Sequence, residues 1–347
     1  MMLVYCYRFG SNVRSSHKKL ESLAKRLVLD DNTRGELESM RKDVFRQIAN
    51  RLKRIAPKEN PWKLSRSEEL RTGSLVRGTA MMDSSDVDVV LVLNFHAKQD
   101  RGSMPRAKDV LILIKSLIPE GYEATLNKRS VRVQKSTPMD NSMRQWHSNL
   151  FNEREKLSMD IVPALRKVAE GPKQSPWWYG ISKTANSGSW IRFNPKTQKD
   201  MFRKLGRRKG QHDDPTVVII ALKHWRNRFR NPPRKLPSYV LEVLTWRDYK
   251  LNPHPENDLT VRFNRILLSM ELAQNAGIRF DELVGGAHKP PGKKVAKREL
   301  LIHDPSNTSH NLIHHFARGD YVWWSKRAKD AAGSHATFEA VLGEWRF

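Results

Sequence analysis

The sequence predicts a mixed α/β protein with two lobes, in which an α/β lobe is followed by a helical lobe. Three observations lead to this prediction. Apolar residues at helical spacing indicate one long helix at 36–56, a β-branched run at 87–93 indicates a buried strand, and the pattern turns helical after about residue 165. A chain of 347 residues is long enough for one bilobal unit or two domains. We expect an N-terminal segment at 1–33, an α/β core at 34–165 and a helical lobe at 166–347.

The long helix at 36–56 is amphipathic. Its apolar residues recur at three- and four-residue steps and form a single stripe: Leu37, Met40, Val44, Ile48, Leu52 and Ile55. At about 100° per residue, Lys42, Arg46 and Lys53 fall on the opposite face. The sequence therefore predicts a helix with one buried side and one basic side.

The other elements follow from shorter patterns. Strands are predicted at 87–93, 129–135 and 157–162, and a helix at 106–118, which ends before Pro119. In the second lobe, Asp213, Asp214 and Pro215 favour a helix start. The helices expected there are 215–230, one that begins at Pro237-Ser238, and one at about 260–276.

The charge balance indicates a polyanionic partner. Lys and Arg number 63 against 37 Asp and Glu, which gives a formal net charge of +26. Release of counterions from phosphates makes nucleic acid the leading partner and an anionic membrane the second. Besides the long helix, a basic cluster with Lys199, Arg203 and Lys204 is a candidate contact.

Cysteine content and hydropathy favour an intracellular protein. The single Cys6 excludes an internal disulfide framework and a Cys-rich zinc site. Histidines at 303, 310, 314 and 315 are expected to be ordinary surface or core residues, since structural zinc usually recruits thiolates. The N-terminal apolar run is too short for a signal peptide, and the sequence has no stretch that could span a bilayer. We expect a cytoplasmic protein, with the nucleus as the alternative.

Three carboxylates indicate the chemistry. Asp86 and Asp88 are two residues apart, so on a strand they share a face, which is costly unless a cation lies between them. Asp160 stands inside an apolar run, where an unpaired charge is expensive. Carboxylates in this pattern hold Mg²⁺ or Mn²⁺ in phosphoryl transfer, and the preceding Gly73-Ser74 turn can offer a backbone N–H and a hydroxyl to phosphate. The sequence therefore predicts a metal-dependent phosphoryl-transfer site.

With these residues the chain resembles the nucleotidyltransferase superfamily with the polymerase-beta-like core. Three later segments resemble the C-terminal half of 2'-5'-oligoadenylate synthases: Ala221–Trp225, Leu236–Thr245 and Ile302–Asn307. The resemblance spans about residues 34 to 332 and narrows to oligoadenylate synthases and cyclic GMP-AMP synthase-like receptors. It implies a bilobal polymerase-beta-like nucleotidyltransferase core with a long N-terminal spine helix and a helical C-terminal lobe.

The resemblance also implies roles for individual residues. Ser74 would hold the donor triphosphate, Lys223 would meet its phosphates, and Tyr239 would stack on the donor base. Ser238 departs from the oligoadenylate synthases, which have a Gln there that reads the donor adenine. Because of this departure, substrates other than ATP and cyclic products both stay open as alternatives. Double-stranded RNA, or DNA, is the implied activator, bound along the basic face of the long helix.

The leading hypothesis is an activated enzyme that joins nucleoside triphosphates through 2'-5' linkages into linear oligoadenylate for innate antiviral signalling. A cyclic dinucleotide is the alternative product. A catalytically silent binder of double-stranded RNA is a further alternative, although a pure binder has no reason to tolerate repulsion among three carboxylates. An RNA-tailing polymerase shares the triad but does not need the C-terminal segments. Protein partners and the oligomeric state stay open.

Overall fold

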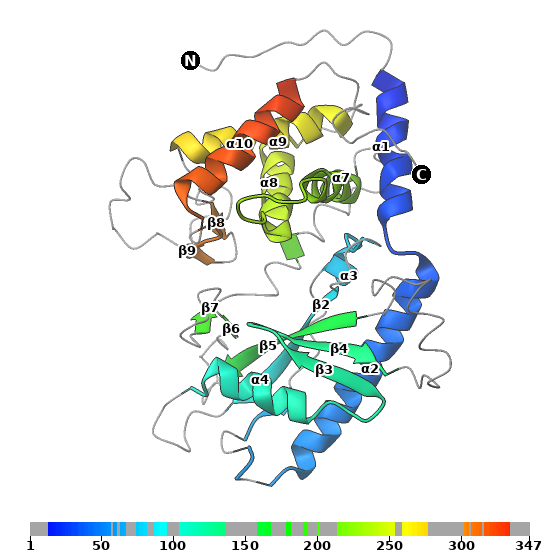
Figure 1. Ribbon diagram of the computed structural model, residues 1–347, viewed down its shortest axis with the longest axis vertical. Helices are drawn as coiled ribbons and strands as arrows, with labels where there is room; N and C mark the ends of the chain where they lie inside the picture. Colours follow the sequence, from blue (N-terminus) through cyan, green and yellow to red (C-terminus); the bar gives the residue numbers. More distant parts are fainter. Residues whose placement is uncertain are drawn as a thin grey trace. The chain divides into compact units, whose positions relative to one another are not determined.

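The computed structural model describes residues 13–56, 58–60, 63–66, 74–81, 87–95, 104–136, 158–167, 178–181, 190–192, 200–201, 214–253, 259–276, 302–304, 307–313 and 316–333. They divide into two compact units (Figure 1). The α/β unit is Leu29–Asp200, and the helical unit combines Met1–Val28 with Met201–Phe347. The mixed α/β fold class with a helical second part is as the sequence predicts. None of the described helices is both long and apolar enough to cross a membrane.

The α/β unit is built on a mixed sheet with the strand order β1-β2-β5-β4-β3, to which β6 and β7 are added beside β5. The strands are β1 (Ser65–Arg66), β2 (Val87–Phe95), β3 (Tyr122–Leu126), β4 (Val131–Lys135), β5 (Ser158–Lys167), β6 (Trp178–Ile181) and β7 (Trp190–Arg192). The central pair β2 and β5 is parallel, and the other pairs are antiparallel. The three strands predicted from the sequence correspond to β2, β4 and β5.

The long helix α2 (Asp31–Arg54) and helix α4 (Ala107–Ser116) cover one face of this sheet (Figure 1). α2 begins five residues before the predicted start because the Asp30 carboxylate accepts a hydrogen bond from the backbone N of Thr33, 2.8 Å away, and so caps it. The predicted apolar stripe of α2 packs against alternate strand residues, which include Val89, Leu91 and Leu93 of β2 and Met159 and Ile161 of β5. Since side chains alternate along a strand, Asp88 and Asp160 belong to the other face.

The helical unit is formed by α1 (Val13–Leu27), α7 (Pro215–Asn227), α8 (Ser238–Leu251), α9 (Leu259–Ala276) and α10 (Arg318–Gly333), with a short hairpin of β8 (His303–Asp304) and β9 (Asn307–Asn311). Its core contains fully buried aromatic residues such as Trp225, Tyr321 and Trp324. α1 packs on α7 and α9, so the N-terminal segment contributes to this core. The Asp214 side chain caps α7 by accepting from the backbone N of Thr216, as the sequence suggests.

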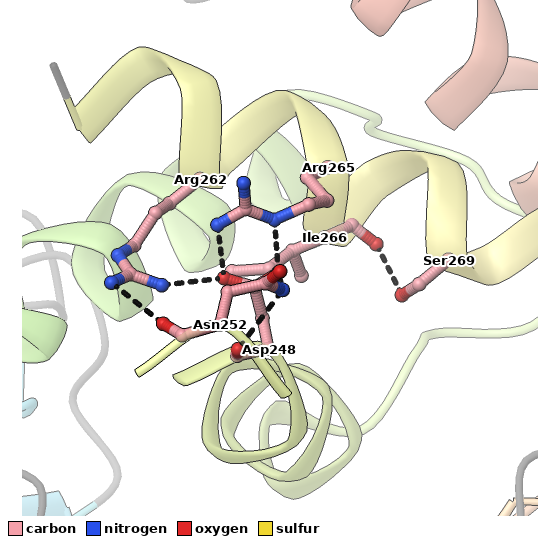
Figure 2. A network of polar contacts seen from close by, with 6 residues as sticks. All are labelled: Asp248, Asn252, Arg262, Arg265, Ile266 and Ser269. Carbon is pink, nitrogen blue, oxygen red and sulfur yellow. Dashed lines mark hydrogen bonds and ion pairs between the residues drawn. The ribbon is translucent and has the colours of Figure 1, made fainter. Parts of the chain in front are cut away.

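A buried polar cluster joins the end of α8 to the start of α9 (Figure 2). The Asp248 carboxylate accepts hydrogen bonds from the guanidinium groups of Arg262, at 2.9 Å, and Arg265. Arg262 also donates to the backbone oxygen of Asn252 at 3.1 Å and lies 3.9 Å from the ring centroid of Tyr249. Bidentate and charge-assisted contacts of this kind fix both position and orientation. The cluster therefore fixes α9 against α8, the helix that begins with Ser238 and Tyr239.

Candidate active site

Two of the predicted catalytic carboxylates lie side by side on the face of the sheet opposite α2 and α4. Asp88 of β2 and Asp160 of β5 are directly paired in the parallel ladder. Neighbouring strands lie about 5 Å apart, and the strand alternation places both side chains on the face away from α2 and α4. Asp88 is exposed, whereas Asp160 is buried at 8% relative exposure. This pairing follows from the chain's register and puts an exposed and a sheltered carboxylate next to each other.

The hairpin between β3 and β4 supplies donors to Asp160. Nδ2 of Asn127 lies 3.2 Å from Oδ1 of Asp160, and Nε of Arg132 lies 3.4 Å from the same oxygen. Arg132 is the β4 partner of Asp160 in the ladder. The sequence reading missed these two residues, although the alternation of buried Val131 and Val133 with Arg132 would have placed Arg132 on the face of Asp160. The buried carboxylate is thus balanced by a cation and an amide of the protein itself.

A second arginine of this hairpin acts on Asp88. Arg129 retains an exposed surface, yet partial desolvation lowers the pKa of its guanidinium, and the charge of the Asp88 carboxylate opposes that shift. Arg132 therefore lies beside Asp160, and the positive charge of Arg129 interacts electrostatically with Asp88. Two adjacent negative charges would otherwise repel each other, and positive partners reduce that repulsion.

Ser74 is the first residue of the short helix α3 (Ser74–Arg77), which contacts β2. The backbone N of Thr79 donates to the carbonyl oxygen of Ser74 at 2.9 Å, and Gly78 has φ 69°, a left-handed conformation that glycine adopts without strain. This closed turn leads toward the strand that carries Asp88. Gly73 and Asp86 lie outside the described residues, so their predicted roles remain predictions.

The described carboxylates fit a hard divalent cation. Asp88 and Asp160 offer oxygen ligands from adjacent strands on one face, which are the donors that Mg²⁺ and Mn²⁺ prefer. Among the described residues, no group of three or more His, Cys, Asp and Glu side chains is placed to hold a metal ion. The third predicted ligand, Asp86, is not one of them. The structure therefore places two of the three predicted ligands together.

The predicted nucleotide-binding residues of the helical unit each contact another side chain. Nζ of Lys223 on α7 lies 2.7 Å from Oε1 of Glu242 on α8, and both side chains are buried. The hydroxyl of Tyr239 donates to Oδ1 of Asp304 at 3.1 Å, and Oγ of Ser238 accepts from Nη1 of Arg226 at 2.7 Å. The partners Glu242, Asp304 and Arg226 were not predicted. These contacts hold the start of α8 against α7 and the β8–β9 hairpin.

The candidate nucleic-acid residues are placed in part. Lys42, Arg46 and Lys53 are exposed on α2, opposite the buried stripe. Arg46 donates to Oδ1 of Asp43 at 2.8 Å, which reduces the positive charge of that face. Lys199, Arg203 and Lys204 lie outside the described residues. Exposure of the α2 residues is what the sequence predicts, whereas binding of nucleic acid there stays a prediction.

No family model matches the chain, and no curated protein matches it. Solved structures do. The chain is similar to CdnC of E. coli MS115-1, determined with ATP, at 19% identity and a TM-score of 0.58 over 94% of this chain and 95% of that one. DncV of Vibrio cholerae, a cyclic AMP-GMP synthase and prokaryotic cGAS homolog, matches at 14% identity and 0.56 over 96% of each chain.

The CD-NTase CdnG of Bradyrhizobium diazoefficiens, in complex with GTP, matches at 12% identity and a TM-score of 0.57, over 93% of this chain and 91% of that one. Matches that cover both units of the chain at these scores show a common fold. These matches agree with the predicted resemblance to cyclic GMP-AMP synthase-like receptors, and they give no specific support for a resemblance to oligoadenylate synthases. The chain therefore has the mixed α/β, polymerase-beta-like fold of CdnC, DncV and CdnG.

Proposed function

We propose that this protein is a metal-dependent nucleotidyltransferase that joins purine nucleoside triphosphates into a cyclic dinucleotide second messenger for antiviral defence. The observation that carries the proposal is the register of Asp88 and Asp160, which sets two carboxylates on adjacent parallel strands of a nucleotidyltransferase fold. A binder without catalysis gains nothing from two carboxylates placed this close, since arginines must offset their repulsion and one carboxylate, Asp160, is buried. The site therefore favours catalysis over a silent scaffold.

In this proposal Asp88 and Asp160, with Asp86, hold Mg²⁺ or Mn²⁺. A cation bound there would lower the pKa of the attacking ribose hydroxyl and neutralise the charge that develops on the leaving pyrophosphate. Asn127 and Arg132 hold the Asp160 carboxylate in place through its Oδ1. Ser74 at the start of α3 receives the donor triphosphate.

Contacts of the helical unit would fix the donor nucleotide. Lys223 exchanges part of its contact with Glu242 for a phosphate, and the ring of Tyr239 stacks on the base while its hydroxyl stays on Asp304. Holding donor and acceptor in reacting geometry is where most of the rate enhancement of phosphoryl transfer arises.

Two observations favour a cyclic product over linear oligoadenylate. One of the similar structures is named as a cyclic AMP-GMP synthase, and the others hold ATP and GTP. Ser238 carries a hydroxyl where oligoadenylate synthases have an amide for adenine, and that hydroxyl accepts a hydrogen bond from Arg226. Linear 2'-5'-oligoadenylate remains the second candidate because the segments Leu236–Thr245 and Ile302–Asn307 resemble those synthases.

Activation by double-stranded RNA, with DNA as the alternative, is also part of the proposal. It is supported by the net charge of +26 and by the exposed basic residues of α2. Reaction in the cytoplasm is supported by the single cysteine.

The test is a product analysis. The protein is incubated with labelled ATP, GTP, CTP and UTP and Mg²⁺ or Mn²⁺, with and without duplex RNA or DNA. A cyclic dinucleotide resists phosphatase and releases one pyrophosphate for each triphosphate consumed, because both ends are joined. A linear dimer is sensitive to phosphatase and releases one pyrophosphate for every two triphosphates. Product that loses its terminal phosphates would favour the linear candidate, and failure to form any product under all conditions would contradict the proposal.

A further inference from the structure

The helical unit carries an aromatic and basic surface that the candidate site does not use. Phe229, in the loop between α7 and α8, packs edge-on against Trp323 and Trp324 of α10, with ring centroids 5.3 and 5.5 Å apart. Nε1 of Trp324 donates to the backbone oxygen of Arg234 at 2.7 Å, and Arg234 pairs with Asp320 at 3.6 Å. These contacts hold the basic loop between α7 and α8 against one side of α10.

We name the exposed basic residues of this region the α10 basic surface: Arg228, Arg230, Arg234, Lys235, Lys326 and Arg327. Lys326 and Arg327 follow Trp323 by three and four residues, so they lie on the same side of α10 as the ring that meets the loop. The guanidinium of Arg327 is 5.3 Å from the ring centroid of Trp323. Asp320 balances Arg234, and the exposed Asp330 lies one turn beyond Lys326 and Arg327, so the six basic residues of the surface exceed these two carboxylates.

We propose that the α10 basic surface binds the phosphate backbone of a nucleic acid, and that it is a contact for the activator separate from α2. Guanidinium groups match phosphate oxygens in a bidentate way, and four of the six residues are arginines. The aromatic contacts fix the loop in advance, which lowers the entropy that binding must remove. Phosphate contacts carry no base information, so we expect binding without sequence preference. The part that concerns activation rests on the proposed function; the binding itself does not.

An anionic membrane fits this surface less well. Peripheral membrane binding uses aromatic residues that insert between lipids. Trp323 is partly buried, its ring is met edge-on by Phe229, and Arg327 lies over it. The ring is therefore engaged inside the protein, and the six residues that define the surface are charged. Val322, four residues before Lys326, is 37% exposed but is a single aliphatic side chain without an aromatic ring.

The test measures binding by the full chain. Arg230, Lys235 and Lys326 are each changed to Glu, and fluorescence anisotropy is recorded with a labelled RNA duplex, a DNA duplex of the same sequence and a second duplex of unrelated sequence. The matched control changes Lys18, Lys25 and Lys250 to Glu, three exposed lysines of the same unit with the same change in charge. Vesicles of phosphatidylserine and phosphatidylcholine form a separate arm.

We expect the surface variant to lose at least tenfold more affinity than the control. The slope of log affinity against log salt should fall by about two to three units, because three phosphate contacts are removed. Preference for RNA or DNA would identify the activator, and either supports the inference. Equal losses in the two variants, or vesicles bound while duplexes are not, would overturn it. If the wild type transfers no nucleotide but this binding pattern holds, the proposed function fails and the surface is supported.

Discussion

At the scale of single residues, the candidate site depends on how Asp160 is balanced. Its Oδ1 accepts hydrogen bonds from Asn127 and Arg132. The positively charged Arg132 therefore binds the carboxylate that is predicted to bind the metal ion. Arg132 therefore competes with a bound divalent cation for the same carboxylate, because both stabilise its charged form.

Replacing Arg132 with Gln should tighten Mn²⁺ binding. Loss of one positive charge beside Asp160 is expected to raise the affinity about tenfold, which corresponds to about 1.4 kcal/mol. Calorimetric titration of the nucleotide-free protein with Mn²⁺ measures this directly. Arg106→Gln, which removes an exposed arginine paired with Asp109 on α4, is the control and should leave the affinity unchanged. Weaker Mn²⁺ binding in Arg132→Gln would show that the arginine supports the ligands instead.

Ser238 is the residue that should decide the nucleotide preference. Its hydroxyl is shorter than an amide and offers fewer hydrogen bonds to a base. We expect the wild type to use ATP together with at least one other nucleotide, and Ser238→Gln to narrow the choice toward ATP. Competition among labelled nucleotides compares the two proteins, and the same profile for both would remove Ser238 from the specificity assignment.

At the scale of elements, a buried ion pair joins the two helices that carry the proposed nucleotide-binding residues Lys223, Ser238 and Tyr239. Lys223 and Glu242 join α7 to α8 with both side chains buried. The sequence predicted Lys223 on a helix, and the family resemblance implied that it meets the donor phosphates. Its partner Glu242 could not be predicted, because a pairing between helices depends on their packing.

Removing one partner of this pair should destabilise the protein more than removing both. Lys223→Met leaves the Glu242 charge buried, so we expect a loss of about 3 to 5 kcal/mol in the free energy of unfolding. The double variant Lys223→Met with Glu242→Leu should recover part of that loss. Urea unfolding of the wild type, the two single variants Lys223→Met and Glu242→Leu, and the double variant gives the coupling energy. A double variant as unstable as the sum of the single ones would contradict the pairing.

Asp43 connects the long helix to the sheet. It accepts hydrogen bonds from Gln47 and Arg46 of α2 and from the Tyr122 hydroxyl of β3, at 3.1, 2.8 and 3.0 Å. Desolvation alone would raise the pKa of Asp43, but these hydrogen bonds outweigh it and lower the pKa below the ordinary value. A lowered pKa contributes stability above the pKa of the unfolded chain, which is lost as pH falls through the folded one.

The Asp43→Asn variant should therefore melt below the wild type at pH 7, and the difference should shrink as the pH falls below about 4. The side chain is about one-third exposed, at 31%, so solvent screens the effect and we expect a small shift. Thermal denaturation across this pH range is the measurement. A difference that stays constant with pH would mean that the carboxylate charge does not act through these bonds.

At the scale of the whole molecule, the sequence predicted elements with long, regular patterns and missed those that need tertiary contacts. α2 was evident from six apolar residues in one stripe, and all of them except Ile55 are buried. β3 was missed although Tyr122–Leu126 alternates apolar and polar residues, because a five-residue stretch without a buried side chain gives only a weak signal until it pairs with β4. α1 was missed although Leu20, Leu23 and Ala24 have helical spacing, since a short terminal stripe has meaning only beside α7 and α9.

The candidate site divides in the same way. The sequence pointed to Asp88 because it lies two residues after Asp86, and to Asp160 because it stands alone in an apolar run. Strand periodicity and the cost of a buried charge are both local properties that a sequence reveals. Alternation of Arg132 with Val131 and Val133 indicates the face on which Arg132 lies, but not that it contacts Asp160. The contacts of Asn127 and Arg132 with Asp160 depend on which strand pairs with β5, so the sequence could not predict them.

The central claim is that Asp160 acts in metal-dependent nucleotide transfer. The most direct measurement is pyrophosphate release by Asp160→Asn with ATP, GTP and Mg²⁺ or Mn²⁺, together with duplex RNA, compared with Asp109→Asn, which removes a carboxylate of α4 that pairs with Arg106. We predict that Asp160→Asn falls to background while it still binds the RNA duplex and melts cooperatively, and that Asp109→Asn stays close to the wild type. Turnover of Asp160→Asn that remains close to that of the wild type would contradict the account.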